Sequence, residues 1–236
     1  MVHRLAPVGG QGRSSEAGEG APGRRRRWRE TVLLLLIVLA TSVAVKTFFL
    51  QGFYIPSRSM EPQFVENDRI LVQKVSYWGS SPERGDVIVF KDPGGWLPRD
   101  DNGLNPVTRL LAAVGLHPSG GYVVKRVIGV GGDRVACCDE RERLTVNGHS
   151  LDETGYLAAG TEPSAFPFDV EVPQGTLWVM GDNRGNSADS RAHMGGPGGG
   201  YVPADDVVGK VWALIWPWNR TELVRRPAAF ADLVKP

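Results

Sequence analysis

The segment Tyr122-Val-Val-Lys-Arg-Val-Ile-Gly-Val130 decides the fold class, because it is apolar and rich in β-branched side chains. Such residues favour strands over helices. Short runs of the same kind lie on both sides of it, divided by Gly, Pro and Asp, and cover residues 69–74, 86–90, 134–136, 143–146, 176–180 and 207–215. Regular spacing of short strands predicts a mainly β domain built on an antiparallel sheet.

Turns and loops between these runs can also be placed. Asn147-Gly148 separates two of the short runs and predicts a type I′ hairpin, because both residues tolerate a positive φ. Residues 92–121 are predicted to be loop-rich with one helix at 107–114, and residues 155–174 are predicted to be irregular.

An apolar run from Thr31 to Leu50 precedes the predicted sheet. It is close to the roughly 20 residues that cross a bilayer, so it predicts one transmembrane helix. Residues 1–30 hold seven arginines against three glutamates and are rich in Gly, Ser and Pro, which predicts a disordered cytoplasmic tail. Residues 51–236 would then form an extracytoplasmic domain at the plasma membrane.

The alternative for this run is a cleavable export signal that ends near Ser42-Val43-Ala44. We favour a retained anchor, because a segment with candidate catalytic serines follows it closely in the sequence.

That segment is Ile55-Pro-Ser-Arg-Ser-Met-Glu-Pro62, which presents serine hydroxyls on a stretch bracketed by prolines. Lys125 lies within the apolar strand quoted above. A serine hydroxyl attacks a carbonyl only when a base takes its proton, and a neutral lysine is one such base. Burial among apolar neighbours favours the neutral amine, since it penalises the ammonium form. Without further support, these serines would be interpreted as turn caps and the lysine as solvated.

Composition limits the other possibilities. With 236 residues and 42% apolar content, the chain can form a domain with a substantial core, and its net charge of +1 indicates no nucleic-acid partner. The four histidines are scattered, so we expect neither a metal site nor a Ser-His-Asp arrangement.

The sequence leaves open the location of three tryptophans and the bonding state of two cysteines. Trp212, Trp216 and Trp218 fit a core position or a membrane-surface belt equally well. Cys137 and Cys138 are adjacent, and Cα atoms about 3.8 Å apart across a trans peptide lie below the usual disulfide range. We therefore expect free thiols or an intermolecular bond.

Four segments in order, residues 55–62, 84–90, 122–133 and 181–191, make the chain similar to the bacterial type I signal peptidases. The resemblance implies a membrane-anchored serine endopeptidase that removes signal peptides from exported preproteins through an acyl-enzyme and without a cofactor. It also implies substrates with small residues before the cut. Gly185 departs from the family, in which many members carry Asp there.

The resemblance also implies a role for each matching residue. Ser59 would be the nucleophile and Lys125 the general base, Ser57 would help to bind the oxyanion, and Ser187 would orient the lysine. The residues expected to contact the substrate are Ile55, Pro56, Met60, Val123 and Val124. A structural set, Asp182, Arg184, Asp189 and Arg191, would fix its loop through bidentate pairs.

Two other functions are compatible with this pattern. A specialised processing protease of the same Ser-Lys class, acting on a pilin or a conjugation factor, would share the chemistry but not the substrate. A non-catalytic membrane-tethered β module would keep the fold, but its expected sign is loss of the serine or the lysine, and both are present.

Overall fold

The computed structural model describes residues 22–97, 121–158, 160–231 and 233. The chain divides into two units, Met1–Val43 and Ala44–Pro236. The predicted helix at 107–114 lies outside the described residues.

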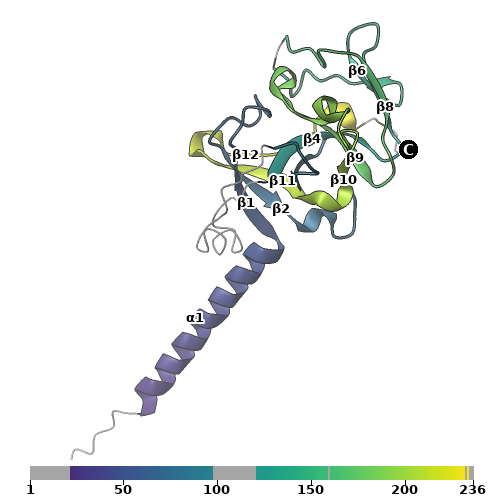
Figure 1. Ribbon diagram of the computed structural model, residues 1–236. Helices are drawn as coiled ribbons and strands as arrows, with labels where there is room; N and C mark the ends of the chain where they lie inside the picture. The colour runs from purple at the N-terminus through teal and green to yellow at the C-terminus, as the bar shows by residue number, and fades with distance from the viewer. Residues whose placement is uncertain (1–21, 98–120, 159, 232, 234–236) are drawn as a thin grey trace, which may run out of the picture. The chain divides into compact units, whose positions relative to one another are not determined.

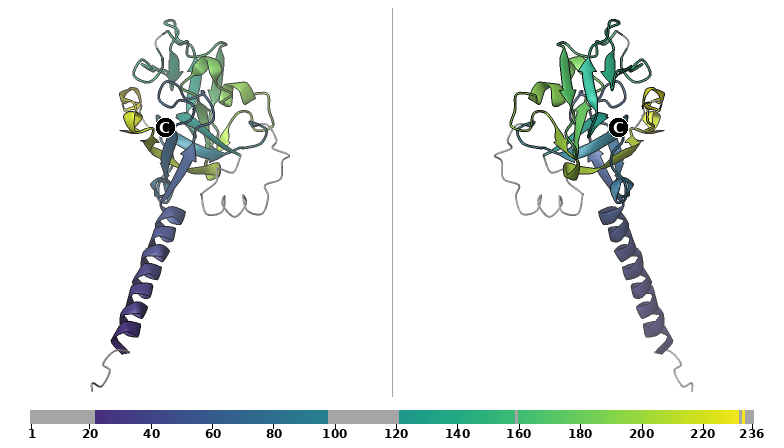
Figure 2. Two further views of the ribbon diagram at one scale, coloured as in Figure 1. Left: turned by 90° about the vertical axis from the view of Figure 1, so that its left-hand side faces the viewer. Right: turned by 90° about the vertical axis from the view of Figure 1, so that its right-hand side faces the viewer.

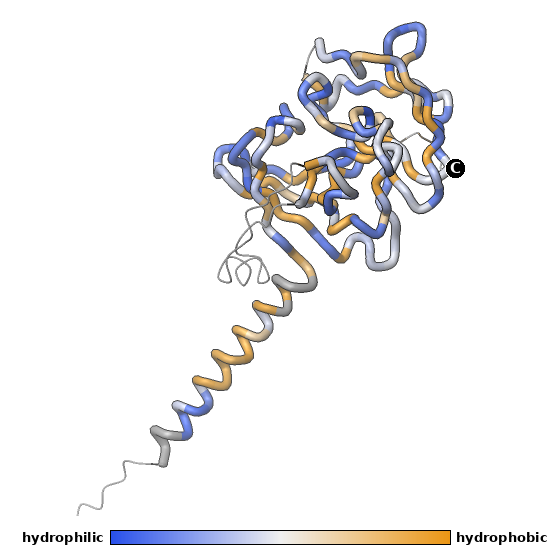
Figure 3. The backbone as a smooth tube through the Cα atoms, viewed as in Figure 1, coloured by the Kyte–Doolittle hydropathy of each residue, from blue (hydrophilic) through white to orange (hydrophobic). Residues whose placement is uncertain are grey.

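Helix α1 runs from Pro22 to Phe48 (Figure 1). Its start corrects the prediction of a disordered tail up to residue 30. Proline is well suited to the first helical position, arginine is a good helix former, and Arg26 pairs with Glu30 one turn later. The hydropathy of α1 changes from hydrophilic to hydrophobic along the chain (Figure 3). No helix in the described part of the chain combines the length and apolar character needed to cross a membrane.

The second unit contains two antiparallel sheets, seen from two sides in Figure 2. The larger has the order β1 (Leu50–Tyr54), β2 (Arg69–Gln73), β11 (Val207–Trp216), β3 (Val87–Lys91), β4 (Tyr122–Val130), β9 (Thr176–Met180) and β10 (Val202–Pro203), and β12 (Glu222–Leu223) pairs with β11. The smaller has the order β7 (His149–Ser150), β6 (Leu144–Val146), β5 (Arg134–Cys137) and β8 (Phe168–Glu171). The prediction of a mainly β antiparallel domain is confirmed.

Short 3-10 helices join these strands: η1 (Val75–Tyr77), η2 (Arg184–Asn186), η3 (Ser190–His193), η4 (Ala204–Asp206), η5 (Trp218–Arg220) and η6 (Ala228–Phe230). The predicted hairpin connects β6 to β7, and Asn147 and Gly148 have φ values of 52° and 78°. Both values lie in the region that a type I′ turn requires.

Two strand positions were predicted wrongly. The apolar run does not stay helical to Leu50, because Leu50–Tyr54 pairs with β2 and buries Phe53. Residues 155–174 are not wholly irregular, since β8 pairs with β5. This strand is only four residues long and lies between Pro167 and Pro173, so its pattern is too short to recognise from local sequence.

Strand β4 is part of the core and carries Lys125. Val123, Lys125 and Val127 share one face, because side chains alternate along a strand. All three are buried, and Val127 belongs to an apolar cluster with Ile88 and Phe90 of β3. Lys125 is therefore carried into the interior by its neighbours in the strand.

The two cysteines differ from expectation. Cys137 and Cys138 form a disulfide bond with each other. The expectation assumed a trans peptide, whereas the bond between them is cis and their Cα atoms are 2.9 Å apart.

The three tryptophans are not core residues. Trp212, Trp216 and Trp218 expose 46%, 44% and 76% of their surface, respectively. The rings of Trp216 and Trp218 contact each other edge to face, with centroids 5.8 Å apart.

Candidate active site

Ser59 and Lys125, which are far apart in the sequence, meet in the second unit. The Nζ atom of Lys125 lies 2.7 Å from the Oγ atom of Ser59 and donates a second hydrogen bond of 3.1 Å to the backbone oxygen of Val124. Both side chains are buried, with Ser59 8% and Lys125 4% exposed. The pair is thus within proton-transfer distance and shielded from bulk water.

The connection that carries Ser59 crosses several strands of the larger sheet to reach Lys125. Ser59 lies in the turns that link β1 to β2, while Lys125 is in β4, and β11 and β3 lie between β2 and β4. At about 4.8 Å per strand, a flat sheet would separate β2 from β4 by roughly 14 Å. The long connection between β1 and β2, residues 55–68, covers this separation and places Ser59 beside Lys125.

The serine segment is held by apolar anchors and backbone hydrogen bonds. Ile55, Met60 and Phe64 are buried in one core cluster. The N–H of Ile55 donates to the carbonyl of Asp68, and the N–H of Phe64 donates to the carbonyl of Met60. Anchoring on both sides of Ser59 fixes the position of its hydroxyl.

The electrostatic environment of Lys125 favours the neutral amine. Burial lowers the pKa of Lys125 from its usual 10.5 to about 8, and the charges of Asp189 and Asp182 oppose this by raising the pKa. Desolvation penalises the ammonium form, and here it outweighs the two carboxylates. About a tenth of the amine is therefore neutral at pH 7, far more than for an ordinary lysine, and about half is neutral at pH 8.

Ser57 lies on the solvent side of this pair. Its Oγ atom is 3.3 Å from the Oγ atom of Ser59, and the residue is exposed. A hydroxyl at this place can approach an oxygen that develops beside Ser59, which is the requirement for an oxyanion donor.

Ser187 lies near the pair but does not bond to the lysine. Its Oγ atom is buried and lies close enough to the Asp189 carboxylate to help lower the pKa of that group. A Cβ atom on Gly181 would lie 2.3 Å from this oxygen and 2.4 Å from the backbone oxygen of Ser59. Glycine at position 181 therefore permits close packing of the two segments, and the lysine-orienting role of Ser187 stays a prediction.

The four charged residues of the structural set make three bidentate pairs, two of them with partners outside the set. Arg191 pairs with Asp189, whereas Asp182 pairs with Arg126 of β4 and Arg184 pairs with Glu153 after β7. All six groups are buried. The pairs connect the loop to strand β4 and to the segment after β7, as well as fixing its own turn.

Sequence reasoning missed three of the residues that organise this site. Asn183 donates from its backbone N–H to the carbonyl of Ser59, and from its side-chain amide to the carbonyl of Arg58, both at 3.0 Å. Arg126 and Glu153 supply two of the ion pairs. Arg126 had a usable signal, because an arginine within an apolar strand requires a buried partner.

The residues expected to contact substrate occupy different environments. Ile55, Met60 and Val123 are buried, Val124 is partly exposed and Pro56 is exposed. Residues 122–125 pair with β3 on one side, whereas pairing with β9 begins only at Arg126. Within the described residues, no strand covers the other edge of this stretch.

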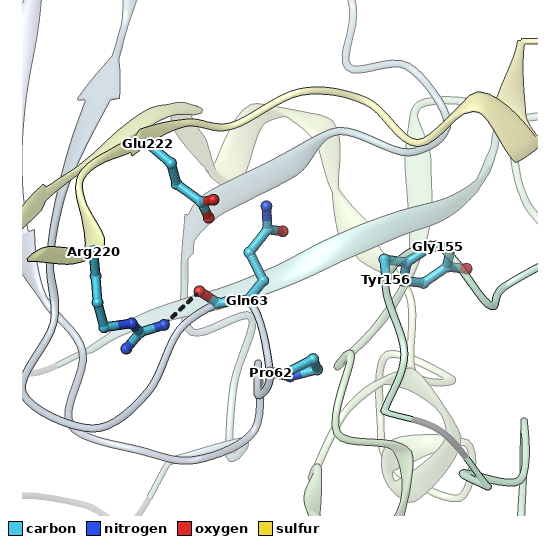
Figure 4. A pocket seen from close by; sticks show the side chains of 6 residues that line it. All are labelled: Pro62, Gln63, Gly155, Tyr156, Arg220 and Glu222. Atoms are coloured by element: carbon cyan, nitrogen blue, oxygen red, sulfur yellow. Dashed lines mark hydrogen bonds between the residues drawn. The ribbon is translucent and has the colours of Figure 1, made fainter.

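A cavity lies close to the serine segment without including the pair. Its volume is about 340 Å³, and its lining residues are Pro62, Gln63, Gly155, Tyr156, Arg220 and Glu222 (Figure 4). Arg220 donates to the carbonyl of Gln63 and pairs with Asp68. Neither Ser59 nor Lys125 lines this cavity, so it is separate from the candidate catalytic groups.

Comparison with known proteins adds independent information. Residues 28–216 match the family model described as signal peptidase, peptidase S26. A signal peptidase I of Mycobacterium tuberculosis is 38% identical over a match that covers 92% of this chain and 82% of that protein. A probable signal peptidase I-2 of Synechocystis is 34% identical, with 84% and 77% coverage. The solved structure of a signal peptidase I from Enterococcus faecalis covers 56% of this chain and 97% of that one at 26% identity, with a TM-score of 0.36.

Proposed function

Since this chain belongs to the peptidase S26 family of signal peptidases, we propose that it cleaves signal peptides from exported preproteins with Ser59 as nucleophile and Lys125 as general base. It is a serine endopeptidase. The observation that carries the residue assignment is the 2.7 Å contact between the Lys125 amine and the Ser59 hydroxyl in a buried environment.

The proposed mechanism uses only groups of this chain. Neutral Lys125 takes the proton of Ser59 while the hydroxyl oxygen attacks the scissile carbonyl carbon. The Ser57 hydroxyl and the Ser59 backbone N–H stabilise the negative oxygen of the tetrahedral intermediate. The ammonium of Lys125 then protonates the leaving amine, and an activated water hydrolyses the acyl-enzyme.

Activity should depend on pH through the base. Because the pKa of Lys125 is about 8, we expect kcat/KM of the wild type to fall about tenfold per pH unit well below that value and to level off above it. The measurement is the pH profile of cleavage between about pH 6 and 10, with enzyme stability checked at each pH. A flat profile across this range would contradict the assignment.

Ser57→Ala should impair turnover more than binding. Loss of one oxyanion donor typically lowers kcat by about 10²–10³, because the bond is strongest in the transition state. The control is Ser57→Thr, which retains a hydroxyl and should keep more activity. An alanine variant with wild-type kcat would remove Ser57 from the mechanism.

The substrate is proposed to bind as an extended peptide along the uncovered edge of residues 122–125. Its backbone would add to that edge, and Ile55, Pro56, Met60, Val123 and Val124 would border the pockets for its side chains. Small residues one and three positions before the cut, typically alanine, are what the resemblance to the type I signal peptidases implies.

The proposed substrate class can be tested directly. Detergent-solubilised full-length protein is incubated with a preprotein that carries Ala-x-Ala before the cut, and with a matched preprotein that carries Leu at both positions. We expect cleavage of the first at the predicted bond, identified by mass spectrometry, and little cleavage of the second. Equal cleavage of both, or of neither, would overturn the proposal.

We further propose that the apolar part of α1, residues 31–48, anchors the enzyme in the plasma membrane, with the amino terminus cytoplasmic. The support is the apolar sequence after a basic segment, and the exposed side chains of α1, among which Leu33, Leu34, Leu35 and Leu36 each expose more than half of their surface. An anchor would hold enzyme and membrane-bound preprotein at high effective concentration. Release of the full chain by alkaline carbonate without detergent would contradict this proposal.

A further inference from the structure

Arg126 follows the proposed base directly in β4 and is only 1% exposed. It forms a bidentate ion pair with Asp182, with distances of 2.8 Å from Nε to Oδ1 and 2.6 Å from Nη2 to Oδ2. Its remaining donors reach the carbonyl of Gly85 at 2.9 Å and the side-chain oxygen of Gln63 at 2.7 Å. The ring of Tyr156 lies 4.6 Å from the guanidinium carbon. Every nitrogen of this cation is therefore held in one orientation.

The position of the pair follows from strand register. Arg126 is opposite Met180 in the pairing of β4 with β9, and Asp182 comes two residues after Met180. The register thus brings the Asp182 carboxylate to the strand that carries Lys125. A negative charge this close favours the ammonium form of the lysine, which is the form that cannot act as a base.

The charged groups around Lys125 come from few elements. The segment after β9 contributes Asp182 and Asp189, whose charges raise the pKa of Lys125. The serine segment contributes hydroxyls, and its charged residues, Arg58 and Glu61, pair with each other. Residues 87–89 of the neighbouring strand β3 are apolar. Asp86, at the start of β3, pairs with Lys210 and Arg226.

Each carboxylate in this region is matched by an arginine. Asp182 pairs with Arg126, Asp189 with Arg191 and Glu153 with Arg184, and all six side chains are at most 7% exposed. The buried cluster carries no net charge while Lys125 is neutral. Because charges are poorly screened in the interior, an unmatched carboxylate here would act strongly on the amine.

We propose that Arg126 is a positioning residue that favours the neutral form of Lys125 by cancelling the charge of Asp182. This inference rests on the proposed role of Lys125 as the base. It assigns the pair an electrostatic effect on the reaction, in addition to the structural role that any buried ion pair has.

The test compares the pH profiles of kcat/KM for three variants of the full-length enzyme. Asp182→Asn leaves the Arg126 charge unmatched, so we expect the acid limb to move to lower pH. Arg126→Met leaves the carboxylate unmatched, so the limb should move to higher pH. Each shift is expected to be on the order of one pH unit. The double variant Arg126→Met/Asp182→Asn removes both charges, and its limb should return to the wild-type position.

A matched control separates electrostatics from loss of structure. Arg84 and Asp133 form another buried bidentate pair, which joins the start of the β3 segment to the residues after β4. Asp133→Asn should lower stability, measured by thermal unfolding, without moving the acid limb. The position of the limb does not depend on how much enzyme is folded, provided that this fraction is constant with pH.

Three results would overturn the inference. The acid limb of Asp182→Asn could lie at the same pH as in the wild type or at a higher pH, or that of Arg126→Met at the same pH or a lower one. The limb of the double variant could also remain displaced from the wild-type position. If Arg126→Met does not fold, Asp182→Asn and the double variant still test the inference. Full activity of Lys125→Met would instead refute the proposed function itself. Loss of activity in Lys125→Met with unmoved limbs in the pair variants would refute only the role of Arg126.

Discussion

Lys125→Met is expected to remove cleavage and, at the same time, to stabilise the folded protein at neutral pH. Methionine has a similar unbranched apolar stem, so the buried space stays filled. The amine that takes the Ser59 proton is lost, and kcat/KM should fall by about 10⁴ or more. Activity and stability therefore change in opposite directions.

The gain in stability follows from the lowered pKa. Folding shifts the pKa of Lys125 from its usual 10.5 to about 8, so the unfolded chain binds more protons between these values. The native protein is then destabilised at pH values below this window, by roughly 3 kcal/mol, and the penalty disappears as pH rises through it. The methionine variant avoids this penalty.

Denaturant unfolding in detergent, at about pH 7 and about pH 10.5, checks this prediction. We expect the variant to be more stable than the wild type at the lower pH and the difference to shrink at the higher pH. Retained cleavage by Lys125→Met would remove the lysine from the mechanism. Equal stability of the two proteins at neutral pH would show that the amine is not desolvated.

Ser59→Ala is the second change with a very large expected effect. It deletes the nucleophilic oxygen and leaves the apolar anchors of the segment, Ile55, Met60 and Phe64, in place. We expect a loss of about 10⁴ or more in kcat, with the preprotein still bound. Mass spectrometry of the wild type, quenched during turnover, should detect an acyl group on Ser59 that the variant lacks.

The two variants together separate binding from chemistry. Since the oxyanion donors and the substrate edge remain in both, KM or the dissociation constant for the preprotein should change little. A Ser59→Ala enzyme that still cleaves at the same bond would require a different nucleophile. A preprotein that no longer binds to either variant would indicate that the pair holds substrate instead of reacting with it.

Local sequence was sufficient where one residue pattern decides one element. The β-branched runs correctly predicted β4 and β9, and the positive φ values at Asn147 and Gly148 match the hairpin that their residue types demand. The beginning of α1 was missed, because the strong compositional signal of the arginine-rich arm hid its helix propensity. Strand β8 was missed because four residues carry too little periodicity.

The residue types of the reaction can be recognised without a structure, since a serine between prolines and a lysine within an apolar strand are visible in the printed chain. The charges that surround that lysine are known only from the folded chain. Arg126 and Asp182 meet through the register of β4 and β9, and Arg184 meets Glu153 of the segment that follows β7. Such pairings depend on long-range strand order and on curvature of the sheet, which are set by burial of the whole core and leave no local pattern in the sequence.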